Sequence, residues 1–308
     1  MDSHQMTAPG PRFKLSFLGP VAVGVVLVAA AFVVASIFTG GSSKTDDTKQ
    51  AISKAEEQVR NDPNSAEFRV AVGDAYLKAN RWDDALSQYT EALKIDANRE
   101  DALFGVGVAN KGKGDLNAAG AALQTVIQLN AGKENNALNP RLQSAHFYLG
   151  QILRDQARYP DAINEFRAAL ALNRADADTL FELGKTFALN GNFDDASQAF
   201  DVALAFVPDF KDAYTETQKL ALTMGDQAKA DYAGAMLQVL NGKAADAVPT
   251  LQRAAEQGRN AHYYWALGYA LEQTKDRDGA LAAYQKAVDI NPGEQMAAES
   301  LRRMQAGG

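Results

Sequence analysis

Residues 183–200 read LGKTFALNGNFDDASQAF, and this stretch allows two interpretations. Its first part, Gly184-Lys185-Thr186, looks like the end of a loop that binds phosphate, whereas the remainder looks like the hinge of a helical hairpin. A phosphate-binding loop also requires a glycine five residues before its Gly-Lys pair, and Thr179 occupies that place. We therefore interpret the stretch as a hairpin and expect no nucleotide-hydrolysing site.

The hinge string NFDDA at 192–196 has relatives elsewhere in the chain, and each ends in an alanine. These alanines are Ala85, Ala119, Ala162, Ala196, Ala247 and Ala280. Their successive spacings are 34, 43, 34, 51 and 33 residues, so the basic period is 34 residues, with one insertion of nine residues and one interval of about one and a half periods. Self-similarity at such a period is typical of a repeat protein.

Small and large residues recur at fixed distances from each hinge. Twelve residues before the alanine stands a glycine: Gly73, Gly107, Gly150, Gly184 and Gly268. Four residues after it stands a large apolar or aromatic residue: Tyr89, Leu123, Phe166, Phe200, Leu251 and Tyr284. Three further on we expect a small or β-branched residue: Ala92, Ile127 (one position late), Ala169, Ala203, Ala254 and Ala287. Small residues let two antiparallel helices approach closely, and large ones fill the remaining gaps.

This pattern resembles the tetratricopeptide repeat, most closely at 177–210, and the resemblance extends over about residues 50–305. It implies an all-α fold, an α-solenoid of antiparallel helix hairpins. A single hairpin cannot bury its own apolar face, so neighbouring hairpins must stack.

The chain is expected to divide as follows. Repeats are expected at 66–99, 100–133, 143–176, 177–210, 228–260 and 261–294. The first four form a front block (66–210) with a polar insertion at 130–141, and the last two form a rear block (228–308) that ends in a capping helix at 295–305. Residues 39–65 are a linker and a leading helix. An odd helix at 211–227 separates the blocks; alternatively, 211–240 forms a pair and the odd helix is 244–257.

A membrane anchor is expected before the repeats. Residues 15–38 carry no charge, and as a helix they would reach roughly 36 Å, enough to cross a hydrocarbon core of about 30 Å. Arg12 and Lys14 precede this span, whereas the first positive charge after it is Lys44. This bias predicts a cytoplasmic tail at 1–14 and an exported C-terminal body. Small residues near Ala35 leave open the alternative that the span is a cleaved signal.

Composition argues against several kinds of chemistry. Beyond residue 44 the chain has 28 basic and 37 acidic residues, so we expect no nucleic-acid partner. There is no cysteine, and the three histidines stand at 4, 146 and 262, so we expect no metal site and no histidine relay. No cofactor and no enzymatic activity are expected, because no catalytic constellation stands out.

The resemblance also implies a binding groove lined by the first helix of each repeat, with repeat positions two, five, nine and twelve facing it. Read at the fifth and ninth positions, the candidate ligand-binding residues are Phe104, Val108, Phe147, Phe181, Trp265 and Tyr269. The alternative is that this apolar row packs between neighbouring repeats. The family's carboxylate clamp, with lysine at position five and asparagine at nine, is not present in any unit.

We therefore expect a membrane-tethered protein–protein interaction scaffold that binds a peptide or protein partner, in envelope assembly or recruitment. Three alternatives remain open at this point. The body could face the cytosol as a receptor, the chain could be a structural subunit of a larger membrane complex, or the groove could supply enzymatic chemistry.

Overall fold

The computed structural model describes residues 43–133 and 139–306. The predicted tail at 1–14 and the predicted membrane helix at 15–38 lie outside the described residues. All described residues belong to one compact unit of the chain, Gly41–Gly308. Among the described helices, none combines the length and the apolar character that a membrane span requires.

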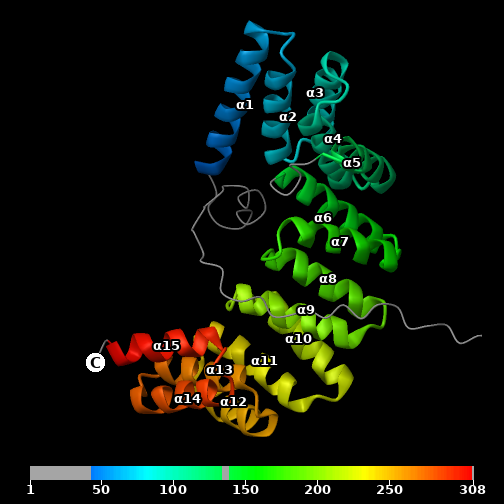
Figure 1. Ribbon diagram of the computed structural model, residues 1–308. Helices are drawn as coiled ribbons and strands as arrows, with labels where there is room; N and C mark the ends of the chain where they lie inside the picture. Colours follow the sequence, from blue (N-terminus) through cyan, green and yellow to red (C-terminus); the bar gives the residue numbers. More distant parts are fainter. Residues whose placement is uncertain (1–42, 134–138, 307–308) are drawn as a thin grey trace, which may run out of the picture. The chain divides into compact units, whose positions relative to one another are not determined.

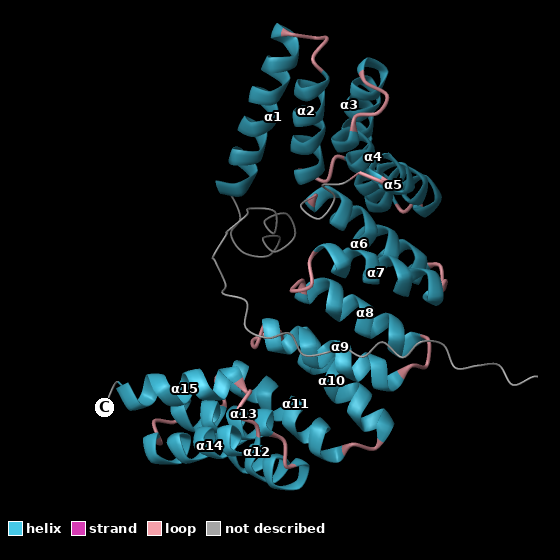
Figure 2. Ribbon diagram, in the orientation of Figure 1, coloured by secondary structure: helices cyan, strands magenta, loops and turns pink. Residues whose placement is uncertain are grey.

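Every regular element in the described residues is an α-helix, and none is a strand (Figure 2). This confirms the predicted all-α fold. The helices are α1 (Ser43–Asn61), α2 (Ala66–Lys78), α3 (Trp82–Ile95), α4 (Glu100–Lys113), α5 (Leu116–Asn130), α6 (Pro140–Asp155), α7 (Tyr159–Leu172), α8 (Ala177–Leu189), α9 (Phe193–Phe206), α10 (Lys211–Met224), α11 (Gln227–Leu240), α12 (Ala244–Gly258), α13 (Ala261–Gln273), α14 (Arg277–Ile290) and α15 (Gln295–Ala306).

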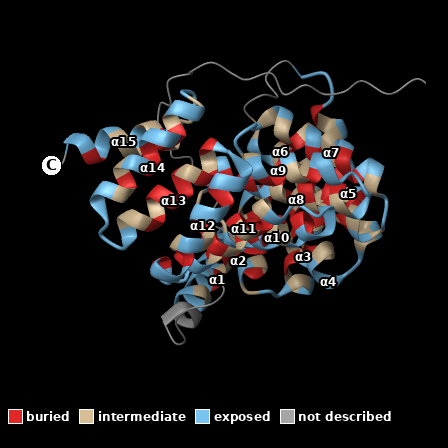
Figure 3. Ribbon diagram, turned by 90° about the horizontal axis from the view of Figure 1, so that it is seen from below, coloured by how far each residue is buried: buried red, intermediate tan, exposed pale blue. Residues whose placement is uncertain are grey.

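The helices pack in chain order as hairpins (Figure 1). The pairs α2/α3, α4/α5, α6/α7, α8/α9 and α13/α14 each form one hairpin, and the second helix of a pair also contacts the first helix of the next. Successive first helices, such as α4, α6 and α8, contact one another as well. Buried residues lie where neighbouring helices meet (Figure 3).

Each hairpin is held together by a ring or a leucine that lies directly on a glycine. A Cβ atom added to Gly184 would lie 2.6 Å from Cε1 of Phe200, and one added to Gly268 would lie equally close to Tyr284. The six hinge alanines are all fully buried, which confirms that they mark close helix contacts. The glycines and large residues of the sequence pattern therefore mark where the two helices of a hairpin pack closely, with one side chain against the backbone of the other helix.

One residue of the pattern was assigned wrongly. We expected Ile127 to take the small or β-branched position of the second repeat, one place late. The structure instead buries Val126 completely, three residues after Leu123, and leaves Ile127 half-buried. Val126 keeps the ordinary spacing, so the repeat has no local irregularity here.

Residues 211–258, where the sequence left the pairing of helices open, form the three helices α10, α11 and α12. α11 packs against both α10 and α12, and α10 also packs against α9. Because it lies between two helices, α11 buries residues around a wide arc: Ala230, Tyr232, Ala233, Ala235, Met236 and Val239. Both pairings that the sequence left open are therefore present, and they share α11.

The ends of the insertion at 130–141 are anchored by side-chain amides. Asn139 caps α6 by accepting hydrogen bonds from the backbone N–H groups of Arg141 and Leu142. Its own amide donates to Asn130 Oδ1 at 3.0 Å and to Glu100 Oε1 at 3.1 Å. Positions 134–138, between these anchors, lie outside the described residues.

Candidate functional site

The sequence Gly184-Lys185-Thr186 lies in the interior of α8. The hydroxyl of Thr186 donates to the carbonyl oxygen of Glu182 at 2.7 Å, one helical turn earlier. The backbone N–H groups of this stretch are used in helix hydrogen bonds, so they are not free to surround a phosphate. The helical interpretation of the opening motif is therefore confirmed.

Three rings form a contact group on the first helices α4 and α6, which we call the front aromatic cluster: Phe104, Phe147 and Tyr148. The ring centres of Phe104 and Tyr148 are 5.8 Å apart, and those of Phe147 and Tyr148 are 5.5 Å apart. All three side chains are half-buried, so part of each ring faces solvent. Val108, one turn after Phe104 on α4, is also half-buried.

Phe181 on α8 belongs to a different ring group. Its centre lies 5.9 Å from that of Phe200 and 4.9 Å from that of Phe210, and no ring contact joins it to the front aromatic cluster. Phe181 packs against both of the largest apolar clusters of the described chain. It is half-buried, so it combines a packing role with a partly open surface.

The rear candidates form a third group. Trp265 is only 5% exposed, and its ring stacks on His262 at 4.9 Å and on Tyr269 at 5.7 Å. A tryptophan buried to this degree has no free face for a ligand, which fits the packing alternative at this position. Tyr269 is half-buried. By their ring contacts, the five aromatic candidates therefore fall into three groups.

Basic residues accompany the aromatic groups, and the sequence analysis did not select them. The Lys111 ammonium lies 5.7 Å from the ring centre of Tyr148, and the Lys185 ammonium lies 5.1 Å from that of Phe181. Burial lowers the pKa of both lysines below the ordinary value, because the charged form loses solvation. Lys111 and Arg154 both stand at repeat position twelve, so extending the reading of groove positions from nine to twelve would have found them.

Arg154 on α6 lies close enough to Lys111 and Lys185 for its charge to act on both. It forms ion pairs with Asp155 at 2.8 Å and with Glu182 of α8, and its side chain is 15% exposed. Glu182 also accepts from Lys185 at 3.3 Å. Besides burial, the charge of Arg154 lowers the pKa of Lys111 and of Lys185, whereas the carboxylate of Asp155 raises the pKa of both lysines. The carboxylates of Glu216 and Asp212 also raise the pKa of Lys185, so the three cations lie among carboxylates on successive first helices. We call Lys111, Arg154 and Lys185 the cationic row.

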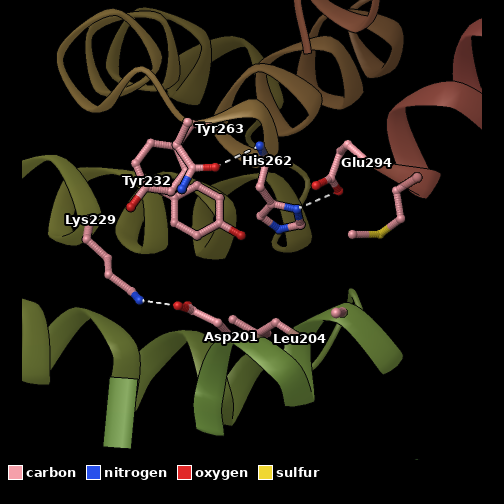
Figure 4. Close-up of a pocket in the computed structure, with 10 residues that line it drawn as sticks. Asp201, Leu204, Lys229, Tyr232, His262, Tyr263 and Glu294 are labelled. Carbon is pink, nitrogen blue, oxygen red and sulfur yellow. Dashed lines mark hydrogen bonds and ion pairs between the residues drawn. The ribbon is translucent and has the colours of Figure 1, made fainter. Parts of the chain in front are cut away.

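A pocket of about 220 Å³ lies between α9, α11, the start of α13 and the residues at the start of α15 (Figure 4). Two ion pairs border it. Lys229 donates to Asp201 Oδ2 at 2.6 Å, and His262 Nδ1 lies 3.3 Å from Glu294 Oε1. The lining residues are Asp201, Leu204, Ala205, Lys229, Tyr232, Asn260, His262, Tyr263, Glu294 and Met296. The charged side chains that border the pocket therefore already pair with one another.

The histidines of the described residues are each paired with a single carboxylate. His146 Nδ1 lies 2.7 Å from Glu165 Oε2, and His262 pairs with Glu294. Across residues 43–133 and 139–306, no group of three or more histidine, aspartate or glutamate side chains is placed to hold a metal ion. The features that remain for a function are partly exposed rings beside cations, which suit non-covalent recognition of a polypeptide.

Comparison with known proteins agrees with the repeat pattern. A family model described as "Tetratricopeptide repeat" matches residues 147–209 and 232–294, and one described as "TPR repeat" matches residues 73–114. No curated protein matches the chain.

Several solved structures are similar in fold. The chain resembles pilF of Pseudomonas aeruginosa, with 19% identity over 64% of this chain and 86% of that one and a TM-score of 0.54. It also resembles the C-terminal part of a TPR repeat-containing protein from Cytophaga hutchinsonii, with 16% identity over 84% and 96% of the two chains and a TM-score of 0.52. For MamA the identity is 24% over 57% and 97%, with a TM-score of 0.50.

Proposed function

Because the chain belongs to the tetratricopeptide repeat family, we propose that it is a protein–protein interaction scaffold that binds a peptide or protein partner through the first helices of its front repeats. The observation that carries this proposal is the front aromatic cluster, whose three rings contact one another and are only half-buried. Rings held in this way lose little conformational freedom on binding and serve as anchors for apolar side chains of a partner. Phe181 and Val108 extend the same apolar surface along α8 and α4 in this proposal.

We further propose that the scaffold is tethered to a membrane by residues 15–38, with the tail at 1–14 in the cytoplasm and the repeats on the outer side. The support is the uncharged length of this segment and the position of Arg12 and Lys14 directly before it. A scaffold held at a membrane in this orientation would recruit or position proteins during envelope assembly.

The orientation has a direct test. In intact cells, a protease added from outside should cleave the repeats if they lie beyond the membrane, and cleavage should stop when the protease is omitted or inhibited. If the repeats become accessible only after the cells are broken, the body faces the cytosol, and the chain is a receptor of the opposite orientation.

Partner binding can be tested by placing a photo-reactive amino acid at Phe147 or at Phe181 in native membranes. We expect both positions to label the same partner, and Phe104→Ala to reduce the labelling from Phe147. Gln124, which is exposed on the second helix α5, provides the control position and should not label that partner. If labelling from Phe147 and Phe181 stays within this chain, the rings serve packing and the proposed binding face is wrong.

A further inference from the structure

Four large apolar side chains are exposed on two neighbouring hinges of the solenoid. Leu189 ends α8 and Phe193 begins α9, so both flank the loop of one hairpin. Leu222 and Met224 lie in the last turn of α10, next to the loop that leads to α11. Leu189 and Leu222 are each 57% exposed. We call these four residues the hinge patch.

An equivalent part of the front repeats indicates that the two hinges are in contact. α3 and α9 are equally long, as are α4 and α10, and the loops that join them also have the same length. Both α4 and α10 end at a glycine in the left-handed conformation, Gly114 and Gly225. A Cβ added to Gly112, in the last turn of α4, would lie 2.9 Å from Cδ2 of Trp82 at the start of α3. Phe193 takes the place of Trp82, so its ring lies beside the last turn of α10, and the hinge patch forms one surface.

The same comparison shows that the hinge patch lacks an ion pair that the front repeats have. Asp83, the second residue of α3, pairs with Lys113, the last residue of α4. The equivalent residues are Asp194 and Met224, so an exposed methionine stands where the front repeats have the lysine. Asp194 and its neighbour Asp195 are both exposed, and neither forms an ion pair with a described residue. Two unpaired carboxylates therefore border the patch.

The positive charges around these hinges do not compensate Asp194 and Asp195. Four cations each have a carboxylate of their own: Arg158 with Asp161, Lys185 of the cationic row with Glu182, Lys219 with Glu216, and Lys229 with Asp201. Arg167 of α7 lies over the Phe187 ring. Asp226 before α11 and Arg259 after α12, which packs against α11, add one charge of each sign. Residues 189–226 together contain seven acidic and two basic residues, so this region attracts a positively charged partner.

We propose that the hinge patch is a docking surface for a basic segment of another protein. Apolar side chains of this segment cover the patch, and its lysine or arginine side chains pair with Asp194 and Asp195. The surface is separate from the front aromatic cluster on α4 and α6, so the inference goes beyond the proposed function. Helices in contact are about 8–10 Å apart and one helical turn rises about 5.4 Å, so a helical segment of about two turns would reach across both hinges.

The test uses the full-length protein to select displayed random peptides, followed by counter-selection against the variant Leu189→Ser/Leu222→Ser/Met224→Lys. This variant keeps Phe104 and Phe147, so the counter-selection removes peptides that bind the front repeats. We expect the surviving peptides to combine apolar residues with at least two lysines or arginines. The three substituted side chains are exposed, so the variant should fold, and circular dichroism checks that its helices are intact.

The charge of the partner is tested by substitutions at the carboxylates. For a surviving peptide, Asp194→Asn/Asp195→Asn should weaken binding about tenfold, and high salt should weaken it as well, because ion pairs at exposed sites are screened. Met224→Lys alone should also weaken binding. It removes an apolar contact and gives Asp194 the cation that Asp83 has in Lys113.

Ile95→Ser is the matched control, because Ile95 is 46% exposed at the end of α3, outside the hinge patch, and it should leave binding unchanged. If no peptide survives the counter-selection, the hinge patch is not a docking surface. If the surviving peptides lack basic residues, or bind Asp194→Asn/Asp195→Asn as well as the wild type, the basic partner is wrong. Neither result affects the proposed function of the front repeats, which labelling from Phe147 and Phe181 tests independently.

Discussion

Replacing Gly184 by alanine should destabilise the protein, although alanine is the better helix former. The new Cβ would lie 2.6 Å from Cε1 and 2.7 Å from Cδ1 of Phe200, about 1 Å inside the usual carbon–carbon contact distance. Phe200 is 1% exposed and also touches the Phe181 ring, so it cannot move without disturbing that neighbour. We therefore expect the repulsion to destabilise the hairpin α8/α9 without relief from a movement of the Phe200 ring.

The magnitude follows from two opposing contributions. Alanine in place of glycine within a helix gains about 1 kcal/mol, whereas forcing one extra carbon into a packed core costs about 1–3 kcal/mol. The position of Phe200 in the core favours the upper end of that cost, so the net loss is about 1–2 kcal/mol. For a chain of this size, the loss corresponds to a fall in Tm of about 2–8 °C.

The assay is thermal unfolding followed by circular dichroism, with Gly120→Ala as the control. Gly120 lies in the interior of α5, and its nearest contact for an added Cβ is Leu149 Cδ1 at an ordinary 3.7 Å. This variant should therefore show the helix gain alone, with Tm raised by about 2–4 °C. If Gly184→Ala raises Tm as much as Gly120→Ala does, the reasoning about close ring–backbone contacts is refuted.

A double substitution separates the ring contact from other causes. Phe200→Leu shortens the side chain that meets the new methyl group, at a cost of its own of about 1–2 kcal/mol. In the Phe200→Leu background, Gly184→Ala should cost at least about 1 kcal/mol less than in the wild type. Additive effects of the two substitutions would show that Phe200 is not the residue that opposes the methyl group.

Three further predictions concern other parts of the described chain. Burial raises the pKa of Tyr214 to about 12, so below pH 10 the tyrosine is protonated in both the folded and the unfolded state. Between pH 10 and 12 only the unfolded chain loses this proton, so the free energy of unfolding falls with rising pH by roughly 3 kcal/mol. Urea titrations should show that Tyr214→Phe removes this fall, and an unchanged pH profile would contradict the prediction. Trp265→Ala should cost about 3–5 kcal/mol in urea unfolding, and a cost below about 1 kcal/mol would show that the ring is not part of the core. Arg303→Met should cost less than about 1 kcal/mol, and less still at high salt, because the Arg303 side chain that pairs with Glu272 is 60% exposed.

Much of the fold was predictable because its contacts are local and repeat. The glycine at one position and the ring sixteen residues later belong to one hairpin, as with Gly150 and Phe166, so a short stretch of sequence contains both partners. The hinge alanines are spaced by the length of a hairpin for the same reason. The glycine and the large residue recur at the same spacing in successive repeats, so their pairing is distinguished from a chance match.

The site was less predictable, because its features depend on contacts between repeats. Trp265 and Phe147 occupy the same repeat position, yet Trp265 is buried by its stacking neighbours while Phe147 stays partly open. The charges around Lys111 depend on another helix, because Asp155 and Arg154 of α6 both act on it. Likewise, the sequence of α11 fits a partner on either side, and only packing shows that it has both.

The sharing of α11 limits how the chain can be divided. A truncation between α10 and α11 would remove the helix that packs against α10, and a truncation between α11 and α12 would remove the helix that packs against α12. A truncation in the loop before α10, around Pro208, would separate no hairpin. Truncated variants should therefore keep α10, α11 and α12 together. The same holds for any gain or loss of repeats through gene rearrangement.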